Sequence, residues 1–234
     1  MNMNSRPIAP PCFARTEQGY SLVELLVAMA VSGIVIAGTY AGYTFFAQQQ
    51  QVLLAQTEVD RNALRSIDLI ASDIRMAGFK DYFNPNVMST SQPIVITTES
   101  PGDIRLVYDE YDASGTLFRA LIRYSLVPYT PASGVTRNRL VREWRKCLNP
   151  AVFCDLASTT IIQGLATGEP MLDWVTSFTV KGLNPRVSGS FSGQYQTVEV
   201  SFSVQSPKKI EGTSRIISKN FSFLTRAKNV SIVP

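Results

Sequence analysis

The chain has 234 residues, and its 22 Lys and Arg outnumber its 18 Asp and Glu, which gives a formal net charge of +4 at pH 7. A positive balance this small is not typical of nucleic-acid-binding proteins, so nucleic acid is not favoured as a partner. The sequence contains no histidine, which excludes His-based catalytic triads, the usual zinc sites and histidine proton switching.

The segment 1–19 is a polar leader that carries Arg6, Arg15 and Glu17. A secretory signal peptide has its small-residue cleavage site after the apolar run, whereas here the small residue Gly19 stands before that run. Cleavage after Gly19 would remove the leader and leave the hydrophobic segment on the mature chain. We therefore expect a processed leader that is not an ordinary signal peptide.

The next predicted element is a membrane-length helix. Residues 20–46 form an apolar run of helix formers in which Glu24 is the only charged residue. At about 1.5 Å per residue, such a run is long enough to cross about 30 Å of hydrocarbon. A lone carboxylate inside such a segment costs roughly 2.5 to 3.5 kcal/mol and is usually functional. Because the run has no Lys or Arg, we expect the partner of Glu24 on another molecule.

The residues Gly-Tyr-Ser-Leu-Val-Glu, from Gly19 to Glu24, are followed by Leu-Leu-Val-Ala. This stretch resembles the N-terminal methylation motif of type IV pilins and type II secretion pseudopilins. The resemblance implies that a prepilin peptidase cuts after Gly19 and N-methylates Tyr20. It also implies that Glu24 pairs with the N-terminus of a neighbouring filament subunit, a contact that sets register more than affinity. The competing reading is a plain signal anchor that tethers a periplasmic domain.

Residues 47–79 are predicted to continue the helix as an amphipathic segment. Apolar residues recur every three or four positions, at Val52, Ala55, Val59, Ala63, Ile67, Ile70, Ile74 and Ala77. The charged residues between them are expected on the wetter faces: Glu58, Asp60, Arg61, Arg65, Asp68, Asp73 and Arg75. No proline interrupts the segment, so the helix should run to about Ala77, with Gly78 as its C-cap.

Two short patterns within the helix narrow its interpretation. Gly38 and Gly42 have the spacing that lets two helices approach closely, although glycine is also common in membrane helices. The stretch Arg-Met-Ala-Gly-Phe at residues 75–79 resembles the PilW-type minor pilins. That resemblance implies a relatively large subunit that is linked to filament priming and to the filament tip.

Residues 80–234 are predicted to form a β-rich head, because apolar residues alternate in short runs broken by Pro, Gly, Ser and Asn. The expected strands are 93–97, 104–111, 117–126, 139–144, 159–163, 174–182, 197–205 and 215–224. Residues 112–115 should form a hairpin turn. Val198, Val200, Phe202 and Val204 should face the core. The expected fold is α+β and pilin-like, with a long N-terminal α-helix packed at its C-terminal half against an antiparallel β-sheet head.

Cys12 lies in the leader, so the mature chain would keep Cys147 and Cys154. In an oxidising periplasm these two cysteines can close a small disulfide loop, which would stabilise the head by about 2 to 3 kcal/mol. Two free thiols are the alternative. Metal binding would need further soft ligands, and no such ligands are apparent in the sequence, so no metal site is expected.

Two charged clusters in the head have competing interpretations. The acidic cluster offers oxygen ligands for calcium but lacks the spacing of an EF-hand loop, and the alternative is a solvated hairpin; its members are Asp103, Asp109, Glu110 and Asp112. The basic run suggests either contact with nucleic acid or a solvated edge strand or protein interface; its members are Arg137, Arg139, Arg142, Arg145 and Lys146, with Trp144 among them.

These patterns and resemblances together predict a structural, non-enzymatic minor pilin without a cofactor. The resemblance implies that it is anchored in the bacterial inner membrane with its head in the periplasm and then enters an extracellular type IV pilus. The implied partners are the prepilin peptidase, other minor pilins, the major pilin and a large tip adhesin. One alternative is a minor pseudopilin of a type II secretion system. Another is a membrane-anchored periplasmic enzyme, against which the absence of histidine argues.

Overall fold

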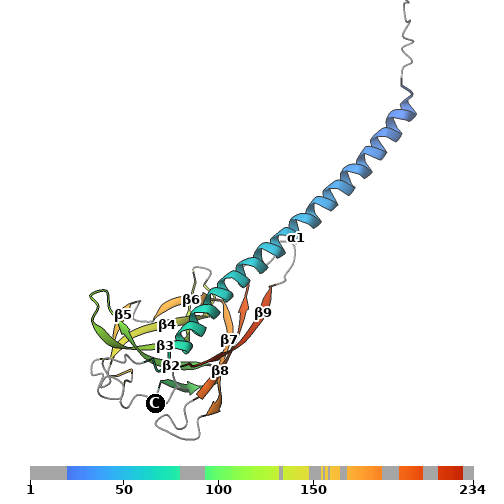
Figure 1. Cartoon of the computed structure of the whole chain (residues 1–234). Helices are drawn as coiled ribbons and strands as arrows, with labels where there is room; N and C mark the ends of the chain where they lie inside the picture. Colours follow the sequence, from blue (N-terminus) through green and yellow to red (C-terminus); the bar gives the residue numbers. More distant parts are fainter. Residues whose placement is uncertain are drawn as a thin grey trace, which may run out of the picture. The chain divides into compact units, whose positions relative to one another are not determined.

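The computed structural model describes residues 20–79, 93–131, 134–147, 154, 156–157, 159–163, 168–185, 195–207 and 216–228. The predicted leader, with Gly19, therefore lies outside the described residues. The chain divides into two compact units, residues 1–47 and residues 48–234. A single long helix and two antiparallel sheets make up the described structure (Figure 1), which confirms the predicted α+β fold class.

Helix α1 spans Leu22–Met76 and ends one residue before the predicted end. Gly78 follows it with a φ of 76°, a left-handed conformation that glycine adopts readily, so the predicted C-cap is confirmed. The backbone then joins the head directly. Gly78 N donates to Val107 O at 2.8 Å, and Asp109 N donates to Phe79 O at 3.0 Å. The exit of the helix is thereby fixed to the second strand of the head.

The larger sheet has six strands among the described residues, in the order β1-β2-β3-β4-β5, and β6 pairs with another part of β4. Their bounds are Ile94–Thr98, Asp103–Tyr111, Leu117–Tyr129, Arg137–Cys147, Thr159–Gln163 and Glu169–Asp173. Every pair is antiparallel. The predicted hairpin turn joins β2 to β3: Asp112 Oδ1 accepts from the backbone N of Ser114 and Thr116, each at 2.9 Å, and Gly115 has a φ of 77°.

The smaller sheet has the order β7-β8-β9 in the described part of the chain. Its strands are Val175–Pro185, Tyr195–Gln205 and Ser218–Arg226. The chain passes from β6 in one sheet to β7 in the other through Trp174 alone, which has a φ of 62°. Such a conformation is strained for a bulky side chain. Gln205 N donates to Trp174 O at 2.9 Å and holds this corner in place.

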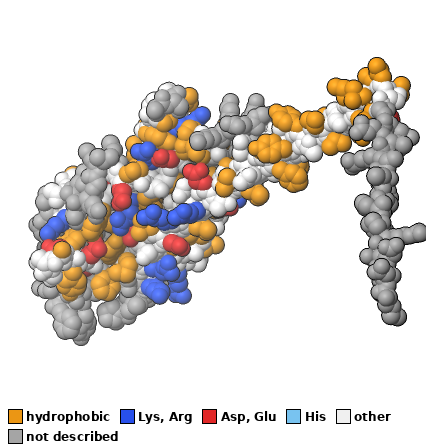
Figure 2. Space-filling model, turned by 90° about the horizontal axis from the view of Figure 1, so that it is seen from above, with side chains coloured by type: hydrophobic (Ala, Val, Ile, Leu, Met, Phe, Trp, Pro, Cys, Tyr) orange, Lys and Arg blue, Asp and Glu red, His pale blue; other side chains and the backbone are white. Residues whose placement is uncertain are grey.

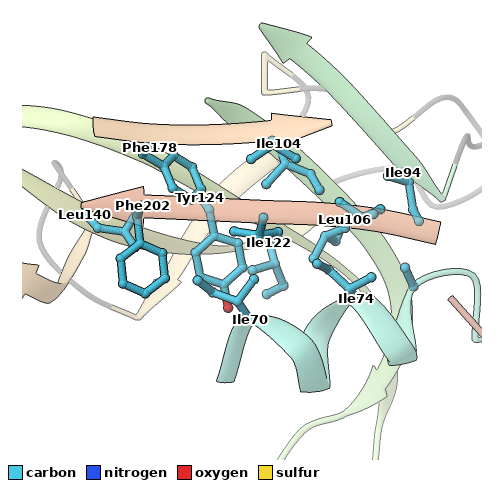
Figure 3. Close-up of a cluster of buried hydrophobic side chains, with 14 of the residues drawn as sticks. Ile70, Ile74, Ile94, Ile104, Leu106, Ile122, Tyr124, Leu140, Phe178 and Phe202 are labelled. Carbon is cyan, nitrogen blue, oxygen red and sulfur yellow. The ribbon is translucent and has the colours of Figure 1, made fainter. Parts of the chain in front are cut away.

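The core lies between the C-terminal half of α1 and the inner faces of both sheets, as Figure 3 shows. Ile70 and Ile74 project from the helix toward strand residues that include Tyr124, Phe178 and Phe202, and all five are essentially inaccessible to solvent. The alternation predicted for β8 is confirmed, because Val198, Val200, Phe202 and Val204 are all buried. The head differs from expectation in having two sheets where one was predicted.

Candidate functional site

The start of helix α1 carries a reciprocal pair of hydrogen bonds. Ser21 N donates to Glu24 Oε2 at 3.1 Å, and Val23 N donates to Ser21 Oγ at 3.3 Å. This is a capping box, in which a serine and a glutamate three residues later satisfy amide groups that the first helical turn leaves unpaired. Tyr20 precedes the cap outside the helix and is 89% exposed.

Glu24 therefore has a partner within its own chain, which the sequence analysis missed. The spacing of Ser21 and Glu24 is itself a capping-box signal in the sequence. The prediction of a partner on another molecule relied instead on the absence of Lys and Arg from the apolar run. The capping bond turns the carboxylate back toward the N-terminus, so the negative charge lies at the end of the helix where its dipole is positive. The intermolecular partner of Glu24 stays a prediction.

The N-terminal half of α1 exposes apolar side chains in every direction. Leu22, Val23, Leu25 and Leu26 are each more than half exposed. Successive helical residues point about 100° apart, so these exposed side chains lie on different sides of the helix. Figure 2 shows hydrophobic side chains along this part of the helix. A helix that is hydrophobic all round belongs in a membrane or inside an assembly.

The same segment is suited to an apolar environment by its internal hydrogen bonding. Helix α1 contains a window with a mean hydropathy of 2.2 and is long and apolar enough to cross a membrane. Its serine and threonine hydroxyl groups bond to backbone carbonyls about one turn earlier: Ser32 Oγ donates to Ala28 O at 2.7 Å, and Thr39 Oγ1 donates to Val35 O at 2.9 Å. These polar groups need no water, so they do not oppose burial in lipid or protein.

Residues 14–40 match the family model described as the prokaryotic N-terminal methylation motif. The match supports a type IV pilin-like or pseudopilin-like protein. The motif implies processing by a prepilin peptidase and assembly with other pilins, and together with the apolar helix it suits an anchor in the inner membrane. No curated protein and no solved structure matches the chain.

A second polar site joins α1 to the head. Asp73 is only 5% exposed, so its predicted place on a wet helix face was wrong. Tyr108 Oη donates to Asp73 Oδ1 at 3.1 Å, Tyr124 Oη donates to Oδ2, and Arg142 Nε donates to Oδ2 at 2.8 Å. Three donors from three strands thus replace the water that this carboxylate loses on burial.

The electrostatics of this Asp73 cluster favour neutral tyrosines and a charged arginine. Burial, and then the neighbouring Asp73 carboxylate, raise the pKa of both Tyr108 and Tyr124. Burial opposes the charge of Arg142, but its hydrogen bond and ion pair with Asp73 outweigh that effect and raise its pKa. The cluster therefore acts as a fixed helix-to-sheet contact and offers no proton near neutral pH.

The basic run does not form an open cationic surface. The alternative of a solvated edge strand was wrong, because β4 has β3 on one side and β5 and β6 on the other, whereas the alternative of a protein interface stays a prediction. Its side chains have partners within the head: Arg139 pairs with Asp173, Arg142 with Asp73 and Arg145 with Glu143, while Arg137 and Lys146 lie over the rings of Trp174 and Phe118.

The acidic cluster is dispersed among separate partners. Asp109 forms a fully buried ion pair with Arg119, so the expected solvated hairpin was wrong for this residue. Asp103 pairs with Arg123 at 2.6 Å, and Asp112 belongs to the hairpin turn. Within the described ranges, no group of three or more potential metal-ligating side chains comes together.

Cys147 and Cys154 are joined by a disulfide bond, with their Cα atoms 5.7 Å apart. Both are buried and pack with Val107 and Leu121 in a cluster separate from the main core. The disulfide therefore ties the end of β4 to a small apolar patch over β2 and β3.

Proposed function

We propose that this chain is a minor pilin that primes assembly of a type IV pilus and sits at or near its tip. The observation that carries the proposal is the all-round apolar helix that begins at Leu22, carries Glu24 as a capping residue in its first turn and overlaps the methylation motif. Such a helix has to leave water. In this proposal it lies in the inner membrane before assembly and among the helices of other subunits afterwards.

Processing follows from the same proposal. A prepilin peptidase removes residues 1–19 by cutting after Gly19 and methylates the new N-terminal residue, Tyr20. Tyr20 is exposed and non-helical, and the helix starts two residues later, so the capping box keeps the chain out of the helix next to the cleavage point. An accessible, non-helical residue at this position is compatible with cleavage by a peptidase.

Assembly then gives Glu24 an intermolecular role. Its carboxylate meets the N-terminal amine of an adjacent subunit when the apolar helix leaves the membrane. Both groups lose hydration in that environment, so their attraction is favourable only when the register is correct. The pair therefore favours one alignment of adjacent subunits over others.

The assignment as a minor pilin draws on residues 75–79, which resemble the PilW type. Gly78 and Phe79 form backbone hydrogen bonds with β2 at the point where the chain passes from the helix into the head, so these residues attach the helix to the sheet. In this proposal the head contacts other minor pilins, the major pilin and a large tip adhesin, and thereby serves adhesion and twitching motility. Its role is structural, without a cofactor.

A minor pseudopilin of a type II secretion system shares the same motif and is the second candidate, because the family match covers residues 14–40 and no part of the head. A deletion strain scored together for surface pili, twitching motility and protein secretion separates the two. Loss of pili and twitching with normal secretion supports the pilus. Loss of secretion alone supports the pseudopilus, and an unchanged strain contradicts both.

A further inference from the structure

The edge strands of the head differ in whether their outward-pointing backbone groups are covered. The outer edge of β7 is covered, because Gly102 N donates to Phe178 O at 2.7 Å and Val180 N donates to Glu99 O at 3.0 Å. The strands β1, β5 and β6 are only five residues long, and β6 contains Pro170. Short, covered or proline-containing edges are the usual means of preventing unwanted strand pairing.

Strand β9 is the exception among the described strands, since it has nine residues and pairs only with β8. Two hydrogen bonds, one at each end, show which residues of β9 direct their backbone groups toward β8: Ala227 N donates to Gln196 O at 3.0 Å, and Ser206 N donates to Ile217 O at 2.8 Å. In an antiparallel pair such bonds recur at every second residue. The odd-numbered residues of β9 therefore bond to β8, and the even-numbered residues point their N–H and C=O groups away from it.

The outward-pointing backbone groups belong to Ser218, Asn220, Ser222, Leu224 and Arg226. No backbone partner for these groups exists in the part of the chain that the structure describes. The edge is thus a row of donors and acceptors without a backbone partner in the described residues; water can bond to them singly, and another extended backbone can pair with the whole row.

The sequence of this edge favours pairing. Residues 220–225, Asn-Phe-Ser-Phe-Leu-Thr, contain no charge, no glycine and no proline. Leu224 is 63% exposed on the outer face of the strand. Lys219, the nearest charge on the preceding side, is held by Asp60 of α1 at 2.6 to 2.8 Å. An edge with an uncharged six-residue centre is an aggregation hazard unless a partner covers it, although Arg226 places a charge at its end.

We propose that the free edge of β9 accepts an extended segment of a neighbouring filament subunit by strand addition. This inference rests on the proposed function, which places the chain in a filament. The partner segment has apolar residues that continue the inner face beside Phe221 and Phe223, and a carboxylate near the exposed Arg226. Pairing of β9 with β9 of a second copy is a closed two-fold contact, whereas filament neighbours meet head to tail, so the partner strand is a different segment.

Position 222 offers a matched test. Ser222 N points away from β8, so Ser222→Pro removes an outward donor without removing a β8 to β9 hydrogen bond. Ser222→Val keeps the donor and favours a strand. We expect the Ser222→Pro chain to be processed and inserted normally but to enter sheared filaments about tenfold less than wild type, since the lost contact sets subunit affinity. The Ser222→Val chain should behave as wild type.

Thermal unfolding of the purified full-length variants in detergent checks that the head remains folded. Normal incorporation of a folded Ser222→Pro chain would overturn the proposal. If that variant unfolds, a photo-crosslinking residue at position 224 provides an independent test, with position 201 on the central strand β8 as its control. The expected adduct joins position 224 to an extended segment of another pilin subunit. An adduct within the same chain, an adduct with β9 of a second copy, or no adduct contradicts the proposal.

A Gly19→Val chain, in which peptidase processing is blocked, separates this inference from the proposed function. If Gly19→Val abolishes processing and filament entry while Ser222→Pro has no effect, only the strand-addition proposal fails. If neither substitution changes the filaments, the assignment as a filament subunit fails as well.

Discussion

Arg142 donates a hydrogen bond from its Nε to Oδ2 of Asp73 at 2.8 Å and so joins β4 to the last turn of α1. Tyr108 and Tyr124 complete the coordination of the same carboxylate. The four groups form a buried polar contact between the helix and the larger sheet. Removal of one charged partner from such a buried pair leaves the other charge without compensation.

Asp73→Asn should therefore destabilise the head strongly. The expected loss in free energy of unfolding is about 3 to 5 kcal/mol, because the largely buried guanidinium of Arg142 loses its counter-charge. Asp60→Asn is the matched control on the same helix: the Asp60 and Lys219 side chains are 40% and 33% exposed, so its loss should be about 0 to 1 kcal/mol. Urea denaturation of the full-length chain in detergent measures both, and equal losses would contradict the account.

The two tyrosines predict a decline in stability at alkaline pH. Their pKa values are raised in the folded chain, so folded Tyr108 and Tyr124 keep protons that the unfolded chain releases near about pH 10. The stabilisation is complete below that pH and is lost as the pH rises above it, by up to about 1.4 kcal/mol per pH unit for each tyrosine. Between about pH 8 and pH 11, the free energy of unfolding of the Tyr108→Phe, Tyr124→Phe double variant should fall less steeply with pH than that of the wild type. If the unfolding free energies of the wild type and the double variant change in parallel with pH, this role of the tyrosines is refuted.

Substitutions at Glu24 separate its charge from its capping role. Glu24→Gln retains a side chain that completes a capping box, whereas Glu24→Ala removes both the cap and the charge. Both variants should be cleaved and inserted normally, and both should enter filaments poorly, because the neighbouring amine loses its partner. Ser21→Ala weakens the cap by about 0.5 to 2 kcal/mol and keeps the carboxylate, so it should assemble better than either. Immunoblots of sheared filaments provide the measurement; wild-type assembly of Glu24→Gln would argue against the amine pairing.

The disulfide predicts a protected pair of thiols and a stability contribution. Without reductant, Cys147 and Cys154 of the folded chain should resist alkylation, and the double Cys→Ser variant should lose about 2 to 3 kcal/mol of unfolding free energy. Mass spectrometry after alkylation counts the labelled thiols. Complete labelling of the unreduced chain would be incompatible with the bond.

Much of the fold was predictable because its signals are local. The helical periodicity and Gly78 located the end of α1 to within one residue, and strict alternation located β8 and its buried face. Strand β6 was missed because its five residues include Pro170, which is atypical of a paired strand. The division into two sheets depends on the corner at Trp174, and no local pattern marks that corner.

The candidate site was predictable only in part, because only some of its residues form a local sequence pattern. The capping box of Ser21 and Glu24 is a local pattern and was present in the sequence. Asp73 looked like one more charged residue of an amphipathic helix. Its partners lie 35, 51 and 69 positions away, so only tertiary folding brings them together and makes burial of the carboxylate favourable.

The central claim is that the chain is processed after Gly19 to become a filament subunit, and intact-mass spectrometry of the chain recovered from the membrane and filament fractions tests it most directly. The account predicts a mass equal to residues 20–234 with one added methyl group and an intact disulfide. A filament-competent chain whose mass still includes residues 1–19 would contradict it.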